Sequence, residues 1–185
     1  MQRTFNAISA TTVRRLFGNT RFFSSGAGPH SLLVPENERE ELKVYATDLP
    51  DIVLSDRNTC DLELILNGGF DPLQGFLTQS DTTSVYDSCR LSNGKLWPMP
   101  INLDITKEKL NEIDAHTSND VALRDFEGNL IAIMNVEDAW EVNKKYEAEQ
   151  VFGGDPEHPA IQFLNTEVKS HYGGGAVKGY QLPIH

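Results

Sequence analysis

Two glycine-containing segments of this 185-residue chain are the first candidates for binding the phosphates of a nucleotide. A P-loop requires GxxxxGK followed by Ser or Thr, because its backbone amides surround the phosphates while the lysine and the hydroxyl complete the site. Gly94-Lys95 is followed by Leu96 and lacks the upstream glycine. The triple glycine Gly173–Gly175 precedes Lys178 without matching the motif. We therefore expect the triple glycine to form a flexible turn.

Asp155, Glu157 and His158 bring carboxylate and imidazole groups together in a pattern that could coordinate a metal ion. A zinc site needs three or four protein ligands, and no second histidine or cysteine stands nearby at ligand spacing. Two prolines divide this segment into a turn and a helix start. We therefore expect Asp155 to cap a helix over residues 156–165, and we assign no metal ligand.

Cys60 and Cys89 are the only cysteines of the chain. Two cysteines do not make a disulfide framework in a chain of this length. A catalytic thiol needs a neighbouring base or positive charge that favours the thiolate, and the sequence identifies no such partner. We interpret both cysteines as structural and expect Cys60, within a predicted helix, to lie in the core.

The strongest local signals for structure surround one predicted helix, over Asp56–Asn67. Ser55 is a suitable N-cap, because its hydroxyl can accept a hydrogen bond from an amide of the first helical turn. Gly68 and Gly69 are expected to end the helix, since glycine adopts a left-handed conformation without a steric clash. The apolar side chains that share one helical face are Leu62, Ile65 and Leu66.

Weaker patterns predict the remaining elements. Before this helix we expect a loop over residues 31–41 and short strands around a turn over residues 44–54. Asn93-Gly94 is one hairpin signal, and residues 127–129 form another between strand-like runs at 121–126 and 130–136. Further helices are expected over residues 107–113 and 137–150, and a last strand over residues 176–184. Short strands with interspersed helices indicate a mixed α+β domain.

Charge is distributed unevenly along the chain, which has 16 basic and 27 acidic residues. The first acidic residue is Glu36, whereas four of the basic residues lie before residue 24, so residues 24–185 hold 12 basic and 27 acidic residues and a formal charge of −15. Such a surface repels nucleic-acid phosphates and anionic lipid headgroups. No apolar run reaches the length of a membrane-spanning helix. We expect neither nucleic acid nor a membrane as a partner.

Residues 1–23 have the composition of an organellar leader. They contain four arginines, five serine or threonine residues and no acid, with a weak apolar stripe at helical spacing. Arg14-Arg15 interrupts the apolar core that a secretory signal would need. We predict a mitochondrial transit peptide over residues 1–23, cleaved after Phe23, with a plastid leader as the alternative. A disordered cytosolic tail remains a third interpretation.

Four blocks of sequence follow one another along the rest of the chain: LSDRNTCDLELILNGGFDPLQGFL, LWPMPINLDI, VALRDFEGNLIAIMNVEDAW and VFGGDPEHPAIQFL. In this order and spacing they resemble the N-terminal domain of the ATP sulfurylase (sulfate adenylyltransferase) family, over about residues 31–185. The resemblance gives its signature positions a structural role. They are Asp61, Leu62, Asn67, Gly68, Gly69, Phe70, Pro72, Gly75, Phe76, Pro98, Met99, Pro100, Arg124, Asp125, Gly153, Asp155, His158 and Pro159.

The resemblance implies a PUA-like β-barrel with interspersed helices over residues 24–185. In that family a separate catalytic domain has QxRN and HxGH motifs, whose donors bind sulfate and stabilise the charge that develops on ATP. Neither motif occurs in this sequence. No catalytic, cofactor-binding or metal-binding residue is therefore transferred, and ATP with Mg is expected only in the full-length enzyme. The isolated chain is expected to be inactive.

Three functions remain open at this level. The chain can be the N-terminal part of a sulfate adenylyltransferase that packs on the catalytic domain, in cis or in trans, and supports a homo-oligomer. It can instead be a stand-alone, non-catalytic protein-interaction module. RNA binding is suggested only by the PUA-like fold, and the negative charge opposes it. The sequence does not decide whether an APS kinase is fused to the parent enzyme.

Overall fold

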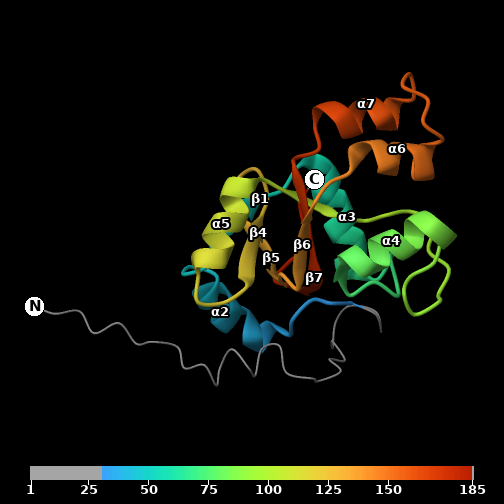
Figure 1. Cartoon of the computed structure of the whole chain (residues 1–185). Coiled ribbons are helices and arrows are strands. Elements are labelled where there is room, and N and C mark those ends of the chain that lie inside the picture. The colour runs from blue at the N-terminus through green and yellow to red at the C-terminus, as the bar shows by residue number, and fades with distance from the viewer. Residues whose placement is uncertain (1–30, 185) are drawn as a thin grey trace, which may run out of the picture.

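Six helices surround a seven-stranded sheet in the computed structural model, which describes residues 31–184 (Figure 1). The path β1-β4-β5-β7-β2 runs through the sheet, and β3 and β6 also pair with β7. Strand β1 is parallel to β4, whereas the other strand pairs are antiparallel. The α+β prediction is confirmed. The strands are β1 Asp51–Val53, β2 Gly75–Phe76, β3 Leu103–Ile105, β4 Asp120–Arg124, β5 Leu130–Asn135, β6 Asp138–Glu141 and β7 His171–Gly179.

Strand β7 is the hub of the sheet, because it pairs with β2, β3, β5 and β6. The triple glycine Gly173–Gly175 lies buried inside this strand, so the prediction of a flexible turn is wrong. The physical reason is the close approach of neighbouring backbones. A Cβ on Gly174 would lie 2.2 Å from the Leu77 carbonyl oxygen, and one on Gly175 would lie 1.9 Å from that of Asn135. Glycine at these positions therefore allows neighbouring strands to approach β7 closely. The strand expected over residues 176–184 is part of β7, which ends at Gly179.

Helix α3 spans Asp56–Asn67, as its capping and periodicity predict. The Ser55 hydroxyl accepts a hydrogen bond from the Asn58 amide at 3.3 Å. Gly68 has the left-handed conformation, with φ 83°, so of the two glycines it alone ends the helix in this way. Cys60 is exposed, which corrects its expected place in the core. Buried Leu62 lies two positions further along the helix, a rotation of about 200° around its axis.

The helices nearer the N-terminus and in the middle of the domain differ in how well local sequence predicts them. Helix α2, Glu36–Tyr45, replaces the loop expected there, because glutamates favour its first turn and Leu42 and Tyr45 pack into the core. Helix α4, Gln79–Ser88, was not predicted, and it is capped by the Thr78 side chain. Helix α5, Lys107–Ala115, confirms the prediction at residues 107–113.

The expected helix over residues 137–150 is divided into strand β6 and helix α6, Lys144–Phe152. The first part of this segment forms strand β6 because it pairs with β7 through backbone hydrogen bonds. Helix α7, Pro159–Thr166, starts later than predicted, since the His158 imidazole, not Asp155, accepts the capping hydrogen bond from the Ala160 amide. Helices α6 and α7 lie side by side at one end of the domain (Figure 1).

The predicted leader, residues 1–23, lies outside the described residues. Within residues 31–184, no helix is both long and apolar enough to cross a membrane. The same part of the chain contains no group of three or more His, Cys, Asp or Glu side chains arranged to hold a metal ion.

Candidate functional site

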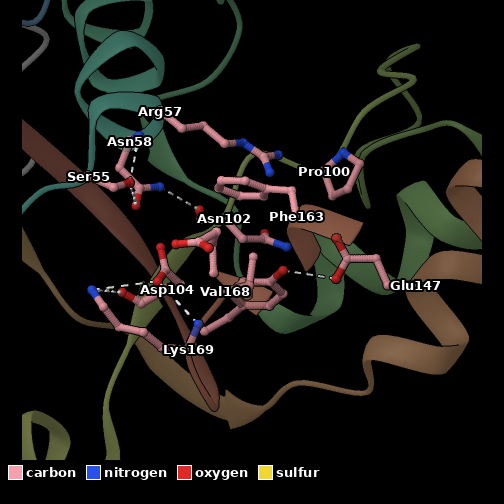
Figure 2. A pocket seen from close by; sticks show the side chains of 12 residues that line it. Ser55, Arg57, Asn58, Pro100, Asn102, Asp104, Glu147, Phe163, Val168 and Lys169 are labelled. Atoms are coloured by element: carbon pink, nitrogen blue, oxygen red, sulfur yellow. Dashed lines mark hydrogen bonds and ion pairs between the residues drawn. The ribbon is translucent and has the colours of Figure 1, made fainter. Parts of the chain in front are cut away.

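A cavity of about 270 Å³ lies where α3, α6, α7 and the strands β3 and β7 meet (Figure 2). Its walls combine polar side chains from α3 and β3 with side chains from the two C-terminal helices. These elements come from distant parts of the sequence. Contacts between the side chains that line the cavity therefore join the helices to the strands β3 and β7.

Asn58 and Asn102 form the wall between α3 and the segment before β3. The Asn58 side-chain amide, which is almost fully buried, donates a hydrogen bond to the Asn102 carbonyl oxygen at 3.2 Å. The Thr82 hydroxyl of α4 donates to the Asn102 side-chain oxygen at 2.8 Å. These bonds join the start of α3 to α4 through a single loop residue, and they satisfy polar groups that burial would otherwise penalise.

Lys169 and Asp104 form a second polar connection at the cavity wall. The Lys169 ammonium lies 3.5 Å from a carboxylate oxygen of Asp104 and donates to its main-chain carbonyl at 3.3 Å. The Lys169 amide donates to the same carboxylate at 3.3 Å. The two residues thus attach the segment after α7 to strand β3 (Figure 2).

Glu147 of α6 places a carboxylate almost completely inside the protein, with 4% of the residue exposed. The Tyr172 hydroxyl of β7 donates a hydrogen bond to it at 3.0 Å. Burial raises the pKa of the Glu147 carboxyl, and hydrogen bonds from Tyr172 and Tyr86 with the charges of Arg57 and Lys144 offset only part of that effect. The same burial, together with the nearby carboxylate, raises the pKa of both tyrosines.

This raised pKa predicts a pH-dependent stability that Glu147→Gln removes. Protonated Glu147 contributes stability that is present below the ordinary glutamate pKa and is lost as pH rises through the higher folded-state value. We expect the variant to melt close to the wild type at about pH 4 and above it at about pH 7. Calorimetric melting curves at both pH values test this. A lower melting temperature for the variant at neutral pH would show that the ionised carboxylate is stabilising.

Arg57 covers the cavity from α3. Its guanidinium carbon lies 5.3 Å from the centre of the Phe163 ring of α7, within the range of a cation–π contact. A carboxylate oxygen of Asp61, one helical turn away, lies 3.9 Å from the Arg57 Nε. The other basic residue of the lining, Lys169, is paired with Asp104.

The balance of charge argues against a nucleotide triphosphate in this cavity. Arg57 and Lys169 are outnumbered by the acidic side chains Asp104, Glu147 and Glu167. Phosphoryl and adenylyl transfer need clustered positive donors around the phosphate chain. The arrangement is therefore a polar network that joins α3, α6 and α7 to the sheet.

The signature positions chosen from the sequence are spread over the fold, and among them only Pro100 lines the cavity. Most of them shape turns, helix ends and strand crossings. Asp61, Leu62 and Asn67 lie on α3, Gly68, Gly69, Phe70 and Pro72 in the turn after it, and Gly75 and Phe76 form β2. Pro98 and Met99 lie between α4 and β3, Arg124 and Asp125 at the β4–β5 turn, Gly153 ends α6, Asp155 lies in the following turn, and His158 and Pro159 begin α7.

Two signature positions show how these residues act. A Cβ on Gly75 would lie 2.0 Å from the Gly175 carbonyl oxygen, so β2 can pair with β7 only because this position is glycine. The Phe70 ring meets Trp97 edge to face, with ring centroids 5.5 Å apart. Sequence reasoning missed the polar residues of the cavity. They come from separate elements, and no local spacing connects them.

Comparison with known proteins agrees with this architecture. Residues 25–182 match the family model described as PUA-like domain. The sulfate adenylyltransferase of Aspergillus oryzae is 48% identical over 147 residues, which cover 79% of this chain and 26% of that protein. The Aspergillus terreus and Neurospora crassa sulfate adenylyltransferases are 49% and 45% identical, covering 79% and 78% of this chain and 26% of each relative.

A solved structure gives the same result for the fold. The structure titled hexameric APS kinase from Thiobacillus denitrificans superimposes with a TM-score of 0.63 at 30% identity, covering 84% of this chain and 26% of that one. The chain therefore spans about a quarter of the length of the relatives it matches.

Proposed function

Because the chain belongs to the PUA-like domain family and is homologous to the N-terminal region of sulfate adenylyltransferases, we propose that it serves as the N-terminal domain of such an enzyme. In this role it packs on the catalytic portion, in cis or in trans, and supports assembly of the subunits. The observation that carries the proposal is a match that covers 79% of this chain but only 26% of its relative.

The chemistry of the whole enzyme belongs, in this proposal, to the catalytic portion. Joining sulfate to the α-phosphorus of ATP with release of pyrophosphate requires positive donors around the phosphates. The cavity has more acidic than basic side chains, and the sequence lacks both the QxRN and the HxGH motif. These observations support a domain that holds neither ATP nor Mg by itself.

An assay of pyrophosphate release tests this assignment. The purified 185-residue chain, incubated with ATP, Mg and sulfate, is expected to give the same signal as a blank without sulfate, because the donors for the reacting phosphate are absent. Intact Aspergillus oryzae sulfate adenylyltransferase in the same assay is the positive control. Sulfate-dependent pyrophosphate release by the chain above the blank would contradict the proposal.

We further propose that residues 1–23 direct import into the mitochondrion, with a plastid as the alternative destination. The support is compositional, since this segment has four arginines and no acidic residue. Sequencing the N-terminus of the protein recovered from its cells tests the predicted processing, because a start at Met1 would contradict cleavage after Phe23.

A further inference from the structure

Helices α6 and α7, here called the helical pair, are packed separately from most of the domain. Their buried apolar side chains form one cluster with the start of β7. Among the described residues, neither helix contributes a side chain to the main core or to the smaller cluster beside α2. A movement of the helical pair therefore leaves the main core closed. The members of its own cluster are Ala148, Ile161, Leu164, Val168 and Tyr172.

Both ends of the helical pair join the sheet at one place. Helix α6 follows β6 and α7 precedes β7, and these two strands pair with Glu141 in register with His171. Just beyond the paired strands, the Val142 amide donates a hydrogen bond to the Ser170 carbonyl oxygen at 3.0 Å. The geometry is that of a hinge, in which a few residues at the ends of elements connect a movable unit to a fixed one.

On the side facing α3 and α4, the helical pair borders the cavity and is attached mainly through polar groups. Phe163 meets the Arg57 guanidinium, and the Tyr146 hydroxyl donates to a carboxylate oxygen of Asp87 at 2.9 Å. Tyr146 and Asp87 are exposed. Contacts that water can reach contribute little free energy, because water replaces them when they separate.

Glu147 is the exception at this boundary, because it is buried. Among the buried polar residues that the structure describes, it alone belongs to the helical pair. Within residues 31–184, no basic side chain lies within ion-pair distance of its carboxylate. Figure 2 shows Glu147 on the side of the cavity opposite to Ser55 and Asn58. The titratable groups that face it come from α3, α4, β7 and its own helix, and they are Arg57, Tyr86, Tyr172 and Lys144. The other titratable side chains of the cavity are Asp104, Glu167 and Lys169.

Ionisation of Glu147 opposes the closed position of the helical pair. A buried carboxylate without an ion pair is costly, and burial raises the pKa of this carboxyl. If the helical pair moves away from α3 and α4, water hydrates the carboxylate and its pKa returns towards the ordinary value. The closed form therefore binds the proton more tightly, and a rise in pH shifts the equilibrium towards the open form.

We propose that Glu147 is a pH-sensitive latch, which holds the helical pair closed over the cavity when protonated and releases it when ionised. The helical pair then acts as a lid that turns on the ends of β6 and β7 and admits water to the cavity. The inference concerns this domain alone and does not depend on the proposed function. Its distinguishing property is a local opening that leaves the sheet folded.

Hydrogen exchange measured by mass spectrometry on the full 185-residue chain tests the latch. Protection is compared for residues 144–166 and for the β4–β5 hairpin, residues 120–135, after correction for the pH dependence of exchange in an unprotected amide. Between about pH 5 and about pH 8, we expect the protection of residues 144–166 in the wild type to fall on the order of tenfold, while the hairpin keeps its protection. Glu147→Gln should remove the fall, because its amide does not ionise in this range.

Glu149→Gln is the matched control on the same helix. Its side chain is 53% exposed, so the variant should keep the pH-dependent fall of the wild type. If Glu147→Gln does not fold, Glu147→Met is a second variant without a titrating group at this position, and its protection should likewise stay constant with pH.

Four results would overturn the latch. The first is constant protection of residues 144–166 in the wild type, whatever the variants do. The second is an equal fall in the wild type and Glu147→Gln, because other groups would then cause it. The third is loss of the fall in Glu149→Gln, which would make the response a property of the total charge of α6. The fourth is an equal fall in residues 120–135, since the whole domain would then open.

Discussion

Replacing Gly175 by alanine is expected to abolish the folded state or to lower its stability by at least about 3 kcal/mol. The added Cβ would lie 1.9 Å from the Asn135 carbonyl oxygen and 3.0 Å from the Glu137 amide nitrogen. Both are backbone atoms, so no side-chain rotation can relieve the collision. The φ of 152° adds strain for any residue with a Cβ. The crossing of β7 with the end of β5 would therefore have to open.

Gly94→Ala is the matched control for this substitution. Gly94 also has a positive φ, 84°, but a Cβ there would meet no atom within 4 Å. Only the left-handed backbone cost remains, about 1–2 kcal/mol. Far-ultraviolet circular dichroism and urea unfolding distinguish the two variants. If Gly175→Ala lost no more stability than Gly94→Ala, the close approach of the two backbones would be refuted.

Leu62→Ala is expected to reduce the free energy of unfolding by about 2–5 kcal/mol. Leu62 is fully buried on α3 and belongs to the main core, with Leu66 of the same helix and Leu103 and Leu123 of the sheet. Truncation removes the transfer free energy of the lost methyl groups and leaves a cavity beneath the helix. Because α3 also provides Asn58 to the polar network, the loss should loosen that wall as well.

Leu64→Ala, on the same helix, is the control for Leu62→Ala. Leu64 is 38% exposed, so its truncation removes less buried area and should cost less than about 1 kcal/mol. Urea titration of both variants gives the difference, provided that the slope with denaturant stays constant. Equal midpoints for the two variants would mean that α3 does not pack on the sheet through the Leu62 face.

The polar cavity connects the C-terminal helices to the sheet inside the domain. Glu147 and its tyrosine partner Tyr172 join α6 to β7 inside the domain.

Local sequence determined those elements whose signals lie within a few residues of one another. Helix α3 could be predicted because Ser55, its apolar face and Gly68 act within single turns of backbone. The β4–β5 hairpin could be predicted for the same reason, since Gly128 supplies the positive φ that its turn requires. The four sequence blocks also indicated the family, and the match to the PUA-like domain model over residues 25–182 together with the similarity to sulfate adenylyltransferases confirms it.

Only the tertiary structure decided the features that depend on distant backbones meeting. Gly173–Gly175 became the centre of a buried strand because β2, β3, β5 and β6 all pair with β7. Strand β6 took the place of a predicted helix start through the same pairing. The cavity joined Asn58, Glu147 and Lys169 from three separate regions. No local pattern encodes such meetings, because their free energy comes from burial and hydrogen bonds between segments that are far apart in sequence.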